Sequence, residues 1–142
     1  MACKKIALIG GGQIGGNLAL LASQKELGDV VIYDIPQTEG MIKGKALDIM
    51  QLRSHDAYDA HVEGNSNPAS MQDADVVIIT AGIPRKPGMD REDLLKINIK
   101  IITDVANNVK KYAPNAFVIV VSNPLDAIVY SFYKVSGFSK NK

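Results

Sequence analysis

Short apolar runs rich in β-branched residues alternate along the chain with longer amphipathic segments. Five of these runs are typical of strands in a parallel sheet, because such strands are covered on both faces and carry apolar residues without strict alternation. They are residues 6–9, 29–33, 61–64, 75–80 and 116–121, and the third of them is the weakest.

The longer segments predict helices at residues 13–25, 41–52, 90–112 and 125–135. In the first helix, the spacing of Ile14, Leu18, Leu21 and Ala22 predicts the face that packs on the sheet, and Gly28 is placed as a C-cap glycine. The apolar stripe of the third helix is expected at Leu94, Ile97, Ile101, Val105 and Val109. The helix at 41–52 has apolar residues on more than one face, which hints at a contact with another subunit.

Strands that alternate with helices predict the doubly wound α/β class, with a parallel sheet and right-handed crossovers. Ligands of such sheets bind outside the carboxyl ends of the strands. We therefore expect the loops that follow Ile9, Tyr33, Thr80 and Val121 to meet at one edge of the molecule.

Composition narrows the class of protein. The chain has 142 residues, 46% hydrophobic and 22% charged, with a formal net charge of +1, which is typical of a globular domain and not of a disordered chain. A near-zero charge argues against a nucleic-acid groove, and no apolar run is long enough to cross a membrane. The single cysteine, Cys3, excludes an internal disulfide. With no secretion signal recognised, we expect a cytoplasmic protein, and no metal use is indicated.

A phosphate-binding motif follows the first strand directly. Gly10-Gly11-Gly12-Gln13-Ile14-Gly15 matches G-x-G-x-x-G and opens the first helix. In this motif Gly10 allows the tight turn, Gly12 lets the backbone approach a diphosphate, and Gly15 lets the helix pack close to the sheet. The amides of the first helical turn would face the phosphates.

Asp34 completes this motif, 19 positions after Gly15 at the end of the second strand. A carboxylate there accepts hydrogen bonds from the ribose hydroxyls and repels a 2′-phosphate, so NAD is predicted over NADP. Neither Ile35 nor Pro36 supplies a cation for that phosphate. The alternative is an ordinary strand–helix turn with a solvated carboxylate at a strand end.

A second glycine-rich segment is rejected as a phosphate site. Gly40-Met-Ile-Lys-Gly44-Lys45-Ala46 faintly resembles a P-loop, but its glycine spacing is one residue short. Ala46 also has no hydroxyl for a metal ion.

The loop from Ala81 to Arg91 carries three cations, Arg85, Lys86 and Arg91, against one carboxylate, Asp90. Its glycines and prolines exclude regular structure. A basic loop at the ligand edge would attract a small anion, and the alternative is a solvated surface loop.

These segments together resemble the amino-terminal, NAD-binding half of the lactate/malate dehydrogenase family. The resemblance covers essentially the whole chain, and it rests on the glycine turn with Asp34, Thr80-Ala81-Gly82, the run from Pro84 to Arg91, Asn98, and Val121-Ser122-Asn123-Pro124. It implies a Rossmann-type sheet of strand order 3-2-1-4-5, with a sixth strand missing after Lys142. The fifth strand would then be an edge with unpaired amides and a hydrophobic face, which invites pairing with another chain.

The resemblance also implies roles for single residues. Arg85 matches the arginine that binds the far carboxylate of malate or oxaloacetate, where lactate enzymes usually carry glutamine. Arg91 matches the arginine that polarises the substrate carbonyl when the loop closes, and Asn123 matches the asparagine that hydrogen-bonds the substrate oxygen. The bond between Asn123 and Pro124 is expected to be cis. The implied cofactor contacts are Gly10, Gly11, Gly12, Gln13, Ile14, Gly15, Asp34, Thr80, Ala81, Gly82, Asn98, Val121, Ser122 and Asn123.

No catalytic residue is assigned within this chain. The proton-transfer histidine of the family, its aspartate partner and a further arginine belong to the carboxyl-terminal half. His55 and His61 are interpreted as surface or structural residues. We therefore expect residues 1–142 to form a dinucleotide-binding domain that binds NAD and is inactive, or nearly so, without the carboxyl-terminal substrate domain.

Three functions remain as alternatives. The first is the NAD-binding part of a malate dehydrogenase of the tricarboxylic acid cycle, a homo-oligomer that acts on a small dicarboxylate and has no nucleic-acid or membrane partner. The second is a lactate-type 2-hydroxy acid dehydrogenase, which Arg85 argues against. The third is a non-catalytic dinucleotide-binding or assembly module, which the short length favours and the residues Arg85, Arg91 and Asn123 argue against.

Overall fold

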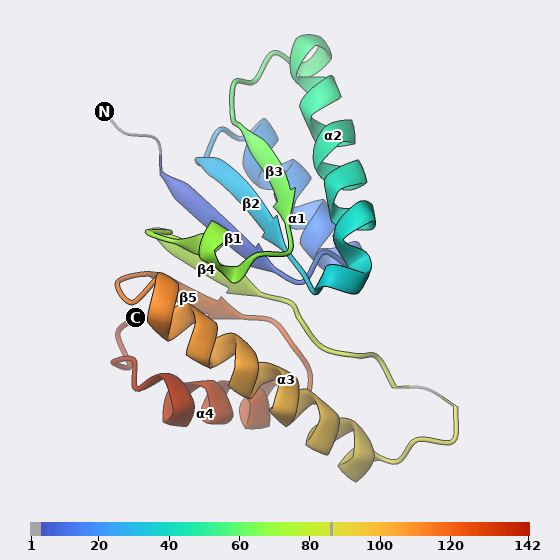
Figure 1. The fold of residues 1–142 in the computed structure, drawn as a ribbon, viewed down its shortest axis with the longest axis vertical. Helices are drawn as coiled ribbons and strands as arrows, with labels where there is room; N and C mark the ends of the chain where they lie inside the picture. Colours follow the sequence, from blue (N-terminus) through green and yellow to red (C-terminus); the bar gives the residue numbers. More distant parts are fainter. Residues whose placement is uncertain (1–3, 86) are drawn as a thin grey trace.

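A sheet of five parallel strands in the order β3-β2-β1-β4-β5 forms the centre of the molecule (Figure 1). In this computed structural model, residues 4–85 and 87–142 are described, so the expectations for Cys3 and Lys86 lie outside the described residues. The strands are β1 (Lys5–Ile9), β2 (Asp29–Tyr33), β3 (Val62–Asn65), β4 (Val76–Ile79) and β5 (Phe117–Val120). The doubly wound class and the predicted strand order are confirmed, with the third strand displaced by one residue and the last two shorter than predicted.

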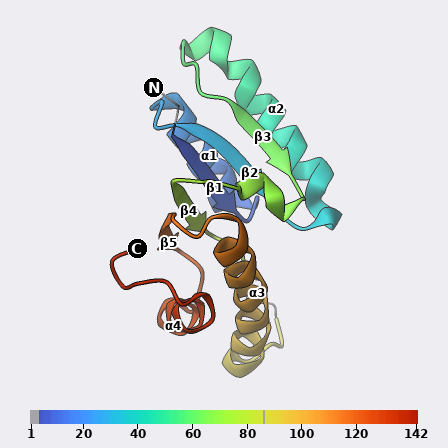
Figure 2. The same ribbon diagram turned by 60° about the vertical axis from the view of Figure 1, so that its left-hand side comes forward.

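Helices cover the two faces of this sheet in pairs. They are α1 (Gln13–Gln24), α2 (Glu39–Asp56), α3 (Arg91–Tyr112) and α4 (Leu125–Ser136), with short 3₁₀ turns at η1 (Pro36–Thr38) and η2 (Pro68–Met71). Figures 1 and 2 show α1 and α2 on one face and α3 and α4 on the other. Strand β1 packs on both pairs, because Ile6 and Leu8 belong to the core under α1 and α2 while Ala7 and Ile9 belong to the core under α3 and α4. This double coverage explains why β1 is apolar at consecutive positions.

Helix α1 packs on the sheet through small residues, and the predicted apolar face is wrong in part. Gly15, Ala19 and Ala22 are buried, whereas Ile14 and Leu21 are 56% and 51% exposed. Glycine and alanine let the helix axis approach the sheet closely, so the inner face of α1 is the one with small side chains. The spacing of large apolar residues does not predict such a face.

The end of α1 also differs from the prediction. The helix ends at Gln24, and Glu26, with φ of 50°, takes the left-handed conformation that was expected of a C-cap glycine. Gly28 is needed for a different reason, because a Cβ atom there would lie 2.3 Å from the carbonyl oxygen of Lys4. Gly28 therefore serves the contact between the start of β2 and the start of β1.

Helix α2 is longer than predicted at both ends. The predicted stripe of α3 is confirmed at Val105 and Val109, which are buried, and it is wrong at Ile97. In α3 the buried residues include Asn98, Ile102 and Ala106, while Ile97 is 39% exposed. Asp90 caps α3, since its Oδ1 accepts a hydrogen bond from the amide of Asp93 at 2.7 Å. The inner face of α3 also contains Asn98, and a polar residue is not recognised as buried from the spacing of apolar residues.

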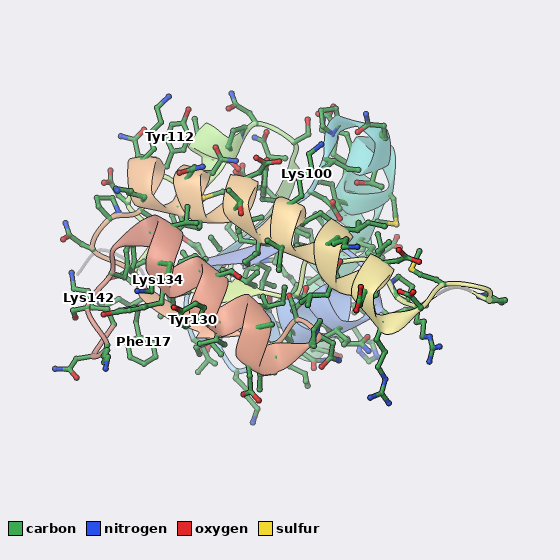
Figure 3. The ribbon with its side chains drawn as sticks, turned by 90° about the horizontal axis from the view of Figure 1, so that it is seen from below. Lys100, Tyr112, Phe117, Tyr130, Lys134 and Lys142 are labelled. Carbon is green, nitrogen blue, oxygen red and sulfur yellow. The ribbon has the colours of Figure 1, made fainter. Side chains whose placement is uncertain are left out.

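Strand β5 is the edge of the sheet, as predicted. The prediction that its outer amides are all unpaired is wrong in part. The amide of Val118 donates to the carbonyl oxygen of Lys142 at 2.6 Å, so the last residues run beside the strand. Figure 3 shows Lys142 near Tyr130 of α4 at this end of the molecule, and both residues line the same pocket. Phe117 and Ile119 are 52% and 42% exposed, so the predicted hydrophobic face of this strand is confirmed.

Candidate functional site

The loops at the carboxyl ends of the strands meet at one edge of the sheet, because all five strands are parallel. The glycine turn lies between β1 and α1, and Asp34 directly follows β2. The long loop at residues 80–90 follows β4, and the turn at 121–124 follows β5. The predicted site residues are therefore distributed over four neighbouring connections.

The glycine turn is locked against the loop after β4. Gly10 has a φ of 106°, and a Cβ atom there would lie 2.8 Å from the amide nitrogen of Ala81. A Cβ atom at Gly15 would lie only 1.9 Å from the carbonyl oxygen of Gly10. The hydroxyl of Thr80 donates to that same oxygen at 3.0 Å. These contacts require glycine at both positions and hold the turn in one conformation.

Gly12 differs from the other glycines of the turn, because a Cβ atom there would meet nothing within 4 Å. Its φ of −63° is also accessible to any residue. The fold by itself does not require glycine here, and no side chain caps the start of α1. Open space beside uncapped helical amides is the arrangement that a diphosphate needs, so these residues fit the cofactor that the motif predicts.

Asp34 is oriented by backbone amides. Its Oδ2 accepts a hydrogen bond from the amide of Gly11 at 2.7 Å, and its Oδ1 accepts one from the amide of Ile35 at 2.8 Å. Each carboxylate oxygen can accept a second hydrogen bond, so the residue can still receive two ribose hydroxyls. The carboxylate is thus already positioned at the turn.

Tyr33 lies beside this carboxylate at the end of β2. Its carbonyl oxygen accepts a hydrogen bond from the amide of Gly10 at 2.9 Å. Partial burial raises the pKa of its phenol, and the negative charge of Asp34 raises it further. The phenol therefore stays neutral at physiological pH and adds no charge to the site.

Lys45 of α2 also reaches the turn, although no sequence pattern points to it. Its Nζ donates to the carbonyl oxygens of Gly11 and Gly12, at 2.7 and 2.8 Å. The segment from Gly40 to Ala46 that contains Lys45 lies entirely within α2, so it is not a phosphate loop in its own right. More than thirty positions separate the lysine from the turn, and only the packing of α2 beside α1 brings them together.

Asn98 joins the two connections on the other side of the site. It is 3% exposed, its Oδ1 accepts from the amide of Ile83 at 2.9 Å, and its Nδ2 donates to the carbonyl oxygen of Asn123 at 2.9 Å. The side chain predicted to contact the cofactor thus bonds to two loops of its own chain. Ser122 acts in the same way, because its hydroxyl donates to the carbonyl oxygen of Ala81 at 2.6 Å.

The basic loop runs outward from the sheet edge toward the start of α3, as Figures 1 and 3 show. Arg85 is exposed, and its Nε donates to the carbonyl oxygen of Met89 at 3.0 Å. Arg91 is the exposed first residue of α3. In this conformation Arg85 lies on the loop and Arg91 at the start of α3, where the loop ends.

The turn after β5 contributes the remaining predicted residues. Val121 is 40% exposed, and its amide donates to the carbonyl oxygen of Ile79 at 2.9 Å. Asn123 is exposed, and the peptide bond between Asn123 and Pro124 is cis, as predicted. This turn brings an exposed asparagine to the same edge as the glycine turn.

The two histidines lie at the other end of the strands. His61 precedes β3, where its amide and carbonyl groups bond to Asp29 and Val30 at the start of β2. His55 is exposed near the end of α2, and its Nδ1 lies 2.6 Å from Asp56. Neither histidine reaches the carboxyl edge of the sheet, so the described residues place no histidine in the site.

Residues 4–85 and 87–142 show neither a membrane-spanning helix nor a cluster of metal ligands. Within that part of the chain, no helix combines the length and the apolarity that a membrane crossing needs. The same residues contain no group of three or more His, Cys, Asp or Glu side chains arranged to hold a metal ion.

Known proteins are similar to this chain in sequence and in fold. The family model described as lactate/malate dehydrogenase, NAD binding domain, matches residues 4–142. Malate dehydrogenase of Myxococcus xanthus is 65% identical over 138 residues, which cover 97% of this chain and 44% of that relative.

Two crystal structures extend the comparison. Cryptosporidium parvum malate dehydrogenase has a TM-score of 0.90 and 53% identity, covering 98% of this chain and 43% of that one. Lactate dehydrogenase of the same organism, with lactic acid and nicotinamide adenine dinucleotide, has a TM-score of 0.90 and 48% identity, again covering 98% and 43%. The chain therefore spans less than half the length of these proteins.

Proposed function

Because this chain belongs to the lactate/malate dehydrogenase family and forms its NAD-binding domain, we propose that the whole protein is a malate dehydrogenase. It would transfer hydride between NAD and the dicarboxylates malate and oxaloacetate, as a cytoplasmic enzyme of the tricarboxylic acid cycle. The observation that carries the choice of substrate is Arg85, a cation on the loop that opens at the cofactor edge.

In this proposal the cofactor lies along the carboxyl edge of the sheet. The diphosphate occupies the open position at Gly12, and the carboxylate of Asp34 receives the adenosine ribose. The nicotinamide lies toward Val121, Ser122 and Asn123. When bound, NAD supplies the carbon that accepts or donates the hydride.

The substrate is held by groups from two loops. Arg85 binds the far carboxylate, and a guanidinium suits that task because it forms two parallel hydrogen bonds with a carboxylate. Arg91 and the side-chain amide of Asn123 stabilise charge on the substrate oxygen as the carbonyl becomes an alkoxide. The loop extends outward here, so it must fold over the edge before Arg85 can reach the substrate.

Residues 1–142 by themselves would bind cofactor without turning over substrate. Hydride transfer to a ketone needs a proton donor, and His55 and His61 lie at the wrong end of the strands. In this proposal the donor belongs to a carboxyl-terminal substrate domain of the complete enzyme.

We also propose that the complete protein is a homo-oligomer that associates through the outer face of α2. Met41, Leu47 and Leu52 are exposed on this helix, although Ile42, Ala46 and Ile49 fill its inner face. Sedimentation of the complete protein tests this, because Leu47→Lys should shift the protein to a smaller species. An unchanged oligomeric state in the variant would contradict the role of α2.

The activity is tested by NADH oxidation in the complete protein, with oxaloacetate and pyruvate as competing substrates. We expect oxaloacetate to be preferred, and Arg85→Gln to lower that preference by about 100-fold or more, because the far carboxylate loses its charged partner. Lys100→Gln, on the exposed face of α3, is the matched control and should leave the preference unchanged. A protein that prefers pyruvate, or an Arg85→Gln variant with unaltered preference, would overturn the assignment.

A further inference from the structure

The carbonyl groups of the glycine turn are held by a cation from a distant helix. Lys45 extends from α2, and its Nζ donates to the carbonyl oxygens of both Gly11 and Gly12, at 2.7 and 2.8 Å. The Gly12 oxygen also accepts the amide of Gly16 at 3.0 Å, which is the first hydrogen bond of α1. Lys45 therefore bonds to two successive peptide groups of the turn.

Room for this lysine is built into α1. Gly16 is not part of the G-x-G-x-x-G pattern, and a Cβ atom there would lie 3.2 Å from both Cδ and Nζ of Lys45. An alanine at this position would favour the helix, since glycine has a lower helix propensity. The three atoms nearest to such a Cβ all belong to Lys45, so this side chain uses the space that the glycine leaves.

Both backbone groups of Gly11 are consequently hydrogen-bonded. Its amide donates to Asp34, and its carbonyl oxygen accepts from Lys45. An ammonium group on the carbonyl side polarises these peptides and adds positive charge next to the turn. Both effects favour a diphosphate at the amide side, and both depend on charge rather than on the apolar stem of the lysine.

From this geometry we infer that Lys45 is a positioning residue for the cofactor diphosphate, acting through the carbonyl oxygens of Gly11 and Gly12 from the far side of the turn. The inference rests on the proposed placement of the diphosphate at Gly12. In this inference Gly16 leaves the space that the Lys45 side chain occupies, and the Lys45 ammonium group holds the turn in place.

The test measures binding of ADP-ribose, which carries the diphosphate, and of adenosine, which does not, by displacement of NADH fluorescence. Lys45→Met keeps the length and apolar stem of the side chain. It should weaken ADP-ribose binding about tenfold, the scale of one charge-assisted hydrogen bond, and leave adenosine within about twofold. Lys45→Arg, which keeps the charge, should recover most of the loss.

Two further variants serve as comparisons for Lys45→Met. Lys43→Met removes a lysine of the same helix that is paired with Glu39, and it should leave both affinities unchanged. Gly16→Ala should weaken ADP-ribose by about two- to threefold through the displaced lysine, while raising the unfolding temperature through helix propensity. A role confined to stability would not produce these opposite changes.

The outcomes are distinct. If Lys45→Met weakens adenosine as much as ADP-ribose, or weakens neither, the inference about Lys45 is wrong. Gly12→Val reports on the underlying placement, because the fold offers space for the side chain and only a ligand would collide with it. If Gly12→Val binds ADP-ribose like the original protein, the placement of the diphosphate is wrong, and the inference fails with it. If Gly12→Val loses ADP-ribose binding and Lys45→Met does not, the diphosphate lies at Gly12 but Lys45 does not position it.

Discussion

The amide of Gly11 donates a hydrogen bond to Oδ2 of Asp34, at 2.7 Å. The turn that would receive the diphosphate and the carboxylate that would receive the ribose are thus bonded to each other in the protein alone. A residue that selects the cofactor therefore also shapes the turn, and the two roles can be separated by substitution.

Asp34→Asn removes the charge but retains an oxygen that can accept from Gly11, whereas Asp34→Ala removes both. Because hydrogen bonds to a charged group contribute about 1.5–3 kcal/mol, we expect NADH affinity to fall about 10-fold or more in Asp34→Asn and further in Asp34→Ala. Fluorescence titration measures both. Asp73→Asn, an exposed residue before β4 whose positive φ suits asparagine, should bind NADH normally. Equal binding by all variants would show that Asp34 does not meet the ribose.

Cofactor selectivity should respond to charge at the same position. Asp34→Ser combined with Ile35→Arg exchanges a carboxylate for a cation at an exposed site, so a 2′-phosphate would be attracted instead of repelled. We expect the ratio of NADPH to NADH affinity to rise by about 100-fold, counting one repulsion removed and one attraction gained. Ile35→Arg alone is the control for the added cation. An unchanged ratio in the double variant would contradict the charge argument.

Loss of the Asn98 side chain should destabilise the fold and loosen the loop after β4. Asn98→Ala leaves the amide of Ile83 and the carbonyl oxygen of Asn123 without their buried partner. We expect the free energy of unfolding to fall by about 1–3 kcal/mol, and hydrogen exchange at the Ile83 amide to accelerate. Urea unfolding and exchange measure these effects. Asn107→Ala, exposed on the same helix, should not destabilise, and similar behaviour of the two variants would exclude the bridging role.

Acid should weaken a pair of contacts that joins β1 to β4. Asp75 accepts from Nζ of Lys4 at 2.8 Å and from the amide of Lys5 at 2.9 Å, and these bonds, led by Lys4, hold the pKa of its carboxyl below the usual value. The resulting stabilisation is present above the unfolded pKa of about 3.9 and is lost as the pH falls through the lower folded value. Asp75→Asn should therefore lose stability at pH 7 and little at pH 2, which urea midpoints can show. A constant difference between the two proteins would contradict this.

Gly15 and Gly16 are adjacent glycines with opposite requirements. A Cβ atom at Gly15 would lie 1.9 Å from a backbone oxygen, whereas at Gly16 its three nearest neighbours would be atoms of the flexible Lys45 side chain. We expect Gly15→Ala to lower the free energy of unfolding by about 3 kcal/mol or more, because the backbone of the turn must shift. Gly16→Ala should raise the free energy of unfolding, because alanine has the higher helix propensity. Chemical unfolding of both tests the pair, and equal stability would show that α1 does not approach β1 this closely.

Local sequence determined the parts of this protein that depend on neighbouring residues. The runs at 29–33 and 75–80 are short, mostly apolar and rich in β-branched residues, which favours buried strands, and the helices between such strands predict a parallel sheet. The glycine turn was recognisable because a strand, a tight turn and a helix must follow one another directly. Asp34 was recognisable because the end of the second strand is a fixed place in such a sheet.

Tertiary packing decided what no local pattern contains. Ile14 is exposed although its spacing places it on the apolar face, because the closeness of α1 to β1 favours Gly15 and Ala19 on the inner side. Asn98 is buried because two loops offer it hydrogen bonds, and Lys45 meets the turn because α2 packs beside α1. Hydrophobic periodicity records only which residues avoid water, whereas these positions depend on directional contacts between segments far apart in the chain, and those contacts exist only once the sheet has assembled.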